Sequence, residues 1–115
     1  MRISQVILRV TDLDVSVRFW TDVVGFDLVS RAGTFAFLEE GLTLNEALDV
    51  PADESLTEIV LEFDDIRSAH AEMADRGVPF EVDLRVVTGD GERELLAAHF
   101  RDPDGHLASV TGWVG

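Results

Sequence analysis

Residue types that commonly carry catalysis or bind metals are scarce in this sequence. The 115 residues include no cysteine, so the chain has no thiolate nucleophile, no thiolate metal site and no disulfide framework. No serine lies in a Gly-x-Ser-x-Gly setting. The histidines are His70, His99 and His106, and no two of them have the i, i+4 spacing that places two imidazoles on one helix face. The residues therefore indicate neither nucleophilic catalysis nor a histidine-based metal site.

Glu58 is the side chain with the clearest potential for binding chemistry. It begins a strand-like run, and Gln5 begins the corresponding run near the N-terminus. A carboxylate at the start of a buried strand is costly unless it is paired or hydrogen-bonded, and Gln5 is a natural partner. Either Glu58 is solvated at the rim of a cleft, or Glu58 and Gln5 together bind a polar or cationic group of a ligand. Glu58 could also act as a general base, although the sequence supplies no partner that would tune its pKa.

Several aromatic residues are further candidates for a binding surface. Phe35 and Phe37 lie two apart and share one face of a predicted strand. They either fill the space between helix and sheet or line a cleft and stack on a ligand. We place Trp113 beyond the core of the last strand, at a cleft mouth, in a dimer contact or in an ordinary packed terminus. Trp20 lies on an apolar helix stripe, which predicts core packing.

The three histidines have different expected settings. His70 lies on the inner stripe of a predicted helix, which indicates a structural role away from the cleft. His99 lies on a predicted strand, and the sequence leaves open which face of the sheet it occupies. We interpret His106, which follows an Asp-Pro-Asp-Gly segment, as a turn residue.

The elements that must position these side chains follow one pattern twice. Residues 6–10 are a β-branched run of strand length, Leu13–Val24 has apolar residues at helical spacing, and Gly25 is where a left-handed cap would end the helix. The same order returns downstream, with a strand at 58–63 and a helix at about 66–76. Two copies of a unit favour a pseudo-symmetric pair, because a solenoid needs about three or more repeats.

Each copy continues with three further strands, so each module reads βαβββ. We predict an α+β fold in which two tandem βαβββ modules form a curved mixed sheet around a cleft, with the helices outside. The length of the chain predicts a single domain over residues 1–115. Module one spans about 3–48, a linker containing Pro51 spans about 49–55, and module two spans about 56–112.

Composition excludes several classes of partner. A net charge of −14 argues against nucleic-acid binding, because phosphates would be repelled. The charge could steer a cationic small molecule towards the protein, or it could simply maintain solubility. No apolar run approaches the roughly 18 residues of a membrane span, and the N-terminus has no signal-peptide pattern. We therefore expect a cytoplasmic protein with no membrane partner.

The chain resembles a known superfamily. The paired modules, the start VILRVTDLDVSVRFWTDVVGFDLV and the ending AHFRDPDGHLASV are similar to the vicinal oxygen chelate superfamily, which includes glyoxalase I, bleomycin-resistance proteins, fosfomycin-resistance enzymes and extradiol dioxygenases. The resemblance covers nearly the whole chain. It implies the fold more than the function, because one fold hosts many activities.

The resemblance also implies where a metal would bind. Metal-dependent members place ligands on the first and last strand of each module, at positions that carry Gln5, Thr43, Glu58 and Ser109 here. The family pattern needs His, Gln or Glu at these places. A catalytic divalent cation commonly takes three protein ligands such as two His and one carboxylate, and Thr43 and Ser109 are poor donors. We therefore predict no bound metal and no cofactor, as in bleomycin-resistance-like members.

These observations favour a protein that binds a small hydrophobic or cationic molecule in its cleft without a catalytic metal. The candidate ligand-binding residues are Gln5, Phe35, Phe37, Thr43, Glu58, Ser109 and Trp113. The resemblance further implies a homodimer, in which the modules of two chains complete two clefts. One alternative is a metal-dependent lyase, transferase or dioxygenase with atypical ligands such as Gln5, Glu58 and a histidine. Another is a non-catalytic scaffold subunit whose cleft is filled by side chains.

Overall fold

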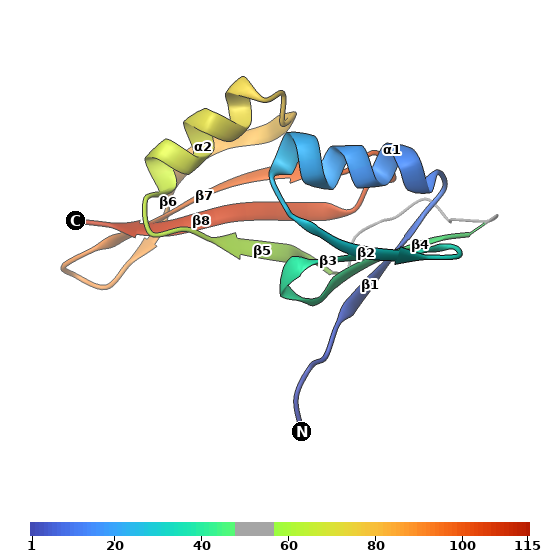
Figure 1. Ribbon diagram of the computed structural model, residues 1–115. Coiled ribbons are helices and arrows are strands. Elements are labelled where there is room, and N and C mark those ends of the chain that lie inside the picture. The colour runs from blue at the N-terminus through green and yellow to red at the C-terminus, as the bar shows by residue number, and fades with distance from the viewer. Residues whose placement is uncertain (48–56) are drawn as a thin grey trace.

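The computed structural model describes residues 1–47 and 57–115 and contains two four-stranded sheets, each with one helix packed on it (Figure 1). The first module consists of β1 (Val6–Val10), α1 (Leu13–Arg18), β2 (Leu28–Ala32), β3 (Phe35–Leu38) and β4 (Leu42–Glu46). The second consists of β5 (Ile59–Glu62), α2 (Ile66–Asp75), β6 (Phe80–Gly89), β7 (Glu94–Arg101) and β8 (Leu107–Val114). The predicted fold of two tandem βαβββ modules is confirmed. The predicted linker, 49–55, lies outside the described residues.

The two sheets have the same internal order. Sheet one runs β1-β4-β3-β2 and sheet two runs β5-β8-β7-β6. In each sheet the first and last strand of the module pair in parallel, β1 with β4 and β5 with β8, while the other neighbours pair antiparallel. Both sheets are therefore mixed, and the matching order shows that the sequence repeat is also a structural repeat.

Both helices begin as the sequence predicts. The side chains of Asp12 and Asp65 each accept a 3.1 Å hydrogen bond from a backbone N–H three residues on, which satisfies one unpaired donor of the first turn. The first helix differs from expectation in its second half, because Phe19–Val24 is π-helical. The Thr21 hydroxyl donates to the Val17 carbonyl in this stretch, and Gly25 ends it with a φ of 115°.

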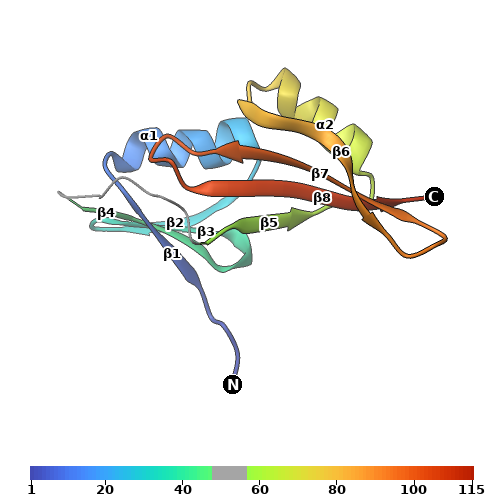
Figure 2. The same ribbon diagram turned by 180° about the vertical axis from the view of Figure 1, so that it is seen from behind.

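The helices lie on the same side of the two sheets, as Figures 1 and 2 show. The helix-facing side holds the core, and its fully buried members include Trp20, Leu44, Met73 and Phe100. Gly112 marks how closely α2 approaches β8, because a Cβ at this position would stand 2.6 Å from the Cβ of Ile66. The opposite side of each sheet, which we call its open face, is covered by no helix in the described chain.

The two modules meet where the first helix contacts the end of β7, the β7–β8 turn and the end of α2. The indole N–H of Trp20 donates to the Asp102 carboxylate at 3.3 Å, and the Trp20 and Phe100 ring centroids are 6.1 Å apart. The guanidinium of Arg76 donates to the carbonyls of residues 23 and 24, at the end of the π-helical segment. His106 Nε2 donates to the Arg9 carbonyl at 2.7 Å, so this residue joins the modules in addition to following the turn.

Burial raises the pKa of the Asp102 carboxyl, and this effect exceeds that of the backbone N–H of His106, which lowers it. The carboxyl group lies in the joint between the modules, where Trp20 covers it.

No helix among the described residues is long and apolar enough to cross a membrane.

Candidate functional site

The open face of sheet one carries a polar pair beside an aromatic pair. Thr43 is 2% exposed, and its hydroxyl donates a 2.8 Å hydrogen bond to Oε1 of Gln5 on the neighbouring chain segment. Phe37 lies directly opposite Thr43 in the β3–β4 register. The Phe35 and Phe37 rings are stacked at a centroid distance of 5.9 Å and an interplanar angle of 8°. The structure thus brings four predicted site residues onto one surface.

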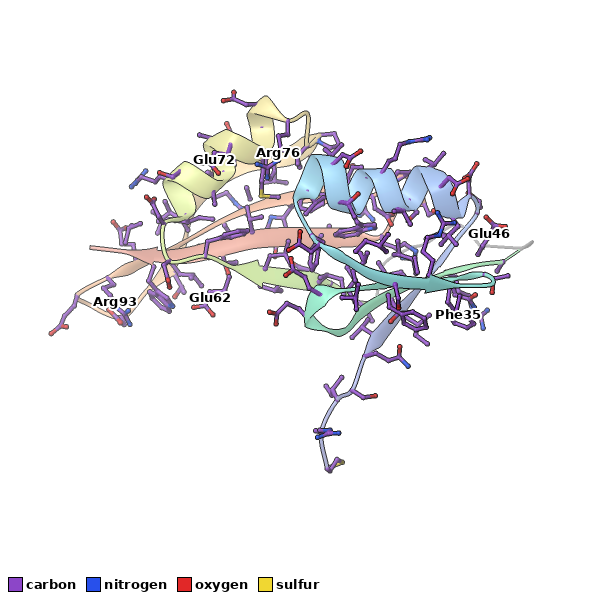
Figure 3. The ribbon with its side chains drawn as sticks, in the orientation of Figure 1. Phe35, Glu46, Glu62, Glu72, Arg76 and Arg93 are labelled. Carbon is purple, nitrogen blue, oxygen red and sulfur yellow. The ribbon has the colours of Figure 1, made fainter. Side chains whose placement is uncertain are left out.

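The orientation of the Phe pair settles an alternative that the sequence left open. Ala36 and Leu38 alternate with the two phenylalanines along β3 and are buried, whereas both phenylalanines are only partly buried. Figure 3 shows Phe35 projecting from the side of the sheet opposite the helices. The pair therefore lies on the open face instead of filling the space under α1, and it offers an apolar surface for stacking.

The open face of sheet two carries Glu58 and His99. His99 pairs with Ser109 across β7 and β8, and Ser109 pairs with Val60 across β8 and β5, so these side chains share one face. Glu58 precedes Val60 by two positions and has its Oε1 3.3 Å from His99 Nε2. Ser109 lies between the strands at 1% exposure. The face of His99, which the sequence did not determine, is therefore the open one.

Arg85 is part of this group, although sequence reasoning did not select it. Its Nη1 donates to the Ala97 carbonyl at 3.0 Å and lies 3.3 Å from His99 Nδ1. Arg85 and His99 meet because Arg85 pairs with Ala97, two positions before His99 on β7. The sequence contained no direct signal for this contact, since bulges in the β6–β7 register decide which β6 side chains lie beside His99.

Trp113 lies inside β8, so the prediction that it lies beyond the core of the last strand is wrong. It pairs with Leu95 of β7 and shares a face with Ser109, four positions earlier. Its indole ring is covered by the guanidinium of Arg93, whose Cζ is 4.8 Å from the ring centroid. The strand continues to Val114 because the long β6–β7 hairpin supplies pairing partners to that point.

A cavity of about 620 Å³ opens beside these faces. It lies between the N-terminal segment, the 3-10 turn Glu39–Gly41 and β5. Of the predicted site residues, Gln5 lines this cavity and the other six do not, while Val60 and Glu62 of the open face also border it. Figure 3 shows Glu62 on the side of the sheets away from the helices.

His70 belongs to the helix side, as predicted. Its ring centroid is 4.5 Å from that of Phe80, and its Nε2 is 3.1 Å from Asp83 Oδ1. The His70–Asp83 distance is short enough for an ion pair, but His70 Nε2 is not oriented to form a hydrogen bond with the carboxylate. The residue packs between α2 and β6 and takes no part in the open faces.

The four positions implied by the resemblance do not fit a divalent metal ion. No group of three or more His, Cys, Asp or Glu side chains within residues 1–47 and 57–115 could hold one. Oε1 of Gln5 already accepts the Thr43 hydrogen bond, and Glu58 lies against His99. Ser109 contributes a neutral hydroxyl at a buried position. This donor set lacks the two imidazoles and one carboxylate that such catalytic sites commonly use.

Comparison with known proteins agrees with this geometry. A model of the Glyoxalase/Bleomycin resistance protein/Dioxygenase superfamily matches residues 2–110. The chain belongs to this superfamily. Crystal structures of members from Nocardioides and from Alicyclobacillus acidocaldarius superpose on this superfamily member with TM-scores of 0.81 and 0.78. The Nocardioides protein is 22% identical in sequence, and the superposition covers 99% of this chain and 84% of the Nocardioides chain. The Alicyclobacillus protein is 20% identical, and the superposition covers 99% of this chain and 92% of the Alicyclobacillus chain. Identities of this size show the shared fold.

One curated relative carries a functional name. The metallothiol transferase FosB of Lysinibacillus sphaericus is 28% identical to this superfamily member over 114 residues, which is 90% of this chain and 77% of the relative. A crystal structure of a protein of unknown function from Agrobacterium tumefaciens is 23% identical, has a TM-score of 0.78 and covers 97% of this chain and 94% of its own. The shared fold alone therefore does not identify an activity, and the function must be inferred from the residues of the site.

Proposed function

We propose that this superfamily member binds a small hydrophobic or cationic molecule on its open faces and uses no catalytic metal. The observation that carries the proposal is the hydrogen bond between Thr43 and Gln5. This hydrogen bond joins Gln5 and Thr43, which stand at the two positions of module one where metal-dependent members place ligands. The stacked Phe35 and Phe37 rings supply an apolar surface for the ligand, and Glu58 supplies a negative charge.

The arrangement of the sheets supports a homodimer as the binding unit. Each chain has two open faces on one side of the molecule (Figure 2), with the aromatic pair on one and Glu58 on the other. If sheet one of one chain faces sheet two of a second chain, an apolar wall and a carboxylate come to lie across one cleft. A twofold dimer would form two such clefts by symmetry.

Binding of two aromatic cations tests this function. Metal-free bleomycin and ethidium are titrated into the wild-type protein and into Phe37→Ala by isothermal calorimetry. We expect the substitution to weaken binding by roughly tenfold, because the ligand loses a stacked ring. Val29→Ala is the matched control, since Val29 is 68% exposed on the edge strand β2 and apart from the aromatic pair. No binding of either probe, or an equal loss in both variants, would contradict the proposal.

A metal-dependent transferase is a second candidate. The similarity to the metallothiol transferase FosB favours it. Metal content of protein purified without chelator separates the two candidates. About one equivalent of metal per chain would favour the transferase.

The scaffold alternative receives less support. A scaffold subunit would fill its cleft with side chains, whereas the cavity beside Gln5 and Glu62 is about 620 Å³ in volume. Small-molecule sites are commonly about 300 to 1,000 Å³. The cytoplasmic location stays a prediction from the sequence.

A further inference from the structure

The side chains of Arg85, His99 and Glu58 lie in a row on the open face of sheet two. Arg85 of β6 contacts His99 of β7 at 3.3 Å, and His99 lies 3.3 Å from Glu58 at the start of β5. Strand β8 lies between β5 and β7 in the sheet, and its Ser109 lies beneath the row at 1% exposure. The small Ser109 side chain lets Glu58 and His99 meet above the strand that separates them.

The contact with Arg85 fixes the proton position on a neutral His99. A guanidinium only donates hydrogen bonds, so Nδ1 of His99 accepts from Arg85 Nη1. The ring proton is then on Nε2, which faces the Glu58 carboxylate. Both ring nitrogens are occupied, so His99 acts as a spacer that holds a cation and an anion at its two ends.

Both charged ends remain accessible to a ligand. The Glu58 side chain is 34% exposed, the His99 side chain is 21% exposed, and Arg85 is exposed. Arg85 is anchored through Nη1 to the Ala97 carbonyl, which orients its guanidinium on the sheet. The ion pair of Arg101 with Glu81, at 3.4 Å, involves neither Glu58 nor Arg85, so it neutralises neither end of the row.

The overall charge narrows the class of ligand. At a net charge of −14, the protein repels an anion that carries no compensating positive charge. A simple cation would satisfy Glu58 but would leave Arg85 without a counter-charge. A molecule that carries an ammonium group and a carboxylate about one aromatic ring apart would meet both ends at once.

We propose that Glu58 and Arg85, spaced by His99, form a subsite for a zwitterionic small molecule. The ligand's ammonium group meets the Glu58 carboxylate and its acidic group meets the Arg85 guanidinium. The proposal rests on the proposed function, because it assigns a ligand class to the same open faces.

Three matched probes test the subsite. 4-(Aminomethyl)benzoate carries both charges across one ring, benzylamine carries only the cation, and 4-methylbenzoate carries only the anion. Their dissociation constants are measured by NMR titration against the isotopically labelled full chain. We expect the zwitterion to bind about tenfold more tightly than either single-charge probe, because it makes two charge-assisted contacts.

Variants assign each charge to its residue. Glu58→Gln should weaken binding of the zwitterion and of benzylamine and should leave the affinity for 4-methylbenzoate unchanged. Arg85→Gln should reduce the affinity for the zwitterion to the affinity for benzylamine. Arg85→Lys should lose less of the affinity for the zwitterion, because lysine keeps the positive charge but lacks the forked geometry of the guanidinium. Glu72→Gln and Arg67→Gln on α2 are the matched controls, since both residues are exposed on the helix side.

The outcomes distinguish this proposal from the proposed function. If the zwitterion binds no more tightly than benzylamine, or if Arg85→Gln leaves their ratio unchanged, the subsite is wrong. The proposed function still stands in that case, provided that ethidium binding depends on Phe37. If no probe binds and ethidium is indifferent to Phe37, both proposals fail.

Discussion

The hydroxyl of Thr43 donates a 2.8 Å hydrogen bond to the side-chain oxygen of Gln5. Each of these residues stands where metal-dependent members of the superfamily are implied to carry a ligand, yet each serves as the other's partner. The contact links the N-terminal segment to β4 across the parallel β1–β4 pair. Module one therefore presents a satisfied polar pair in place of open ligand atoms.

Replacing Thr43 by valine tests the strength of this pair. Thr43→Val keeps the shape of the side chain and removes the donor, so the Gln5 oxygen must be solvated by water. We expect the free energy of unfolding to fall by about 1 kcal/mol, the net contribution of an ordinary hydrogen bond. Urea denaturation measures the change.

Thr34→Val is the matched control for that substitution. The Thr34 hydroxyl donates a 2.9 Å hydrogen bond to Asn45 at an exposed position, where water replaces the lost partner. We expect a smaller loss there. Equal losses at the two positions would show that burial of the Thr43–Gln5 pair adds nothing to its stability.

Asp102 predicts a pH dependence of stability. Burial raises the pKa of this carboxyl in the folded protein above its ordinary value. Its contribution to stability is then fully present below the unfolded-state pKa and is lost as the pH rises through the folded-state pKa. We expect the difference in unfolding free energy between the wild type and Asp102→Asn to fall as the pH rises from about 3.5 to about 7.

Urea denaturation of both proteins across this pH range measures the difference. Asp102→Asn preserves size and an acceptor oxygen for the backbone N–H groups of Asp104 and His106, which both reach Oδ1 in the wild type. A difference that stays constant or grows with pH would contradict the assigned direction of the pKa.

Gly112 tests the packing of α2 on sheet two. An added Cβ would stand 2.6 Å from Ile66 Cβ and 2.7 Å from the Phe63 carbonyl oxygen, so the helix must shift. We expect Gly112→Ala to lower the free energy of unfolding by about 1 to 3 kcal/mol, the usual cost of overpacking. Thr111→Ala on the opposite side of β8 removes a 3.3 Å hydrogen bond to the Leu61 carbonyl and should cost less. A smaller effect at Gly112 than at Thr111 would contradict the close packing.

The fold could be predicted because its determinants are local. Asp12 and Asp65 mark the helix starts, Gly25 ends the first helix, and the repeated order of elements specifies two modules. The π-helical segment at Phe19–Val24 could not be predicted, since its apolar spacing is also that of an α-helix.

The site could be predicted only in part, because its contacts depend on register. Gln5 and Thr43 were selected through the resemblance, and their mutual hydrogen bond follows from the β1–β4 pairing. The meeting of Glu58 with His99 requires the order β5-β8-β7, which the sequence does not specify. The run from Leu95 to Ala98 is apolar at every position, so alternation could not reveal which face His99 occupies.

The most direct test of the central claim is metal content together with metal-dependent thermal stability. Protein purified without chelator is analysed for bound elements, and its melting temperature is followed with Zn²⁺, Ni²⁺, Mn²⁺ and Fe²⁺. We predict no stoichiometric metal and no concentration-dependent rise in melting temperature, since the Thr43–Gln5 and Glu58–His99 contacts occupy the candidate ligand atoms. About one metal ion per chain with a saturable rise would contradict the account and would make Glu58 a metal ligand.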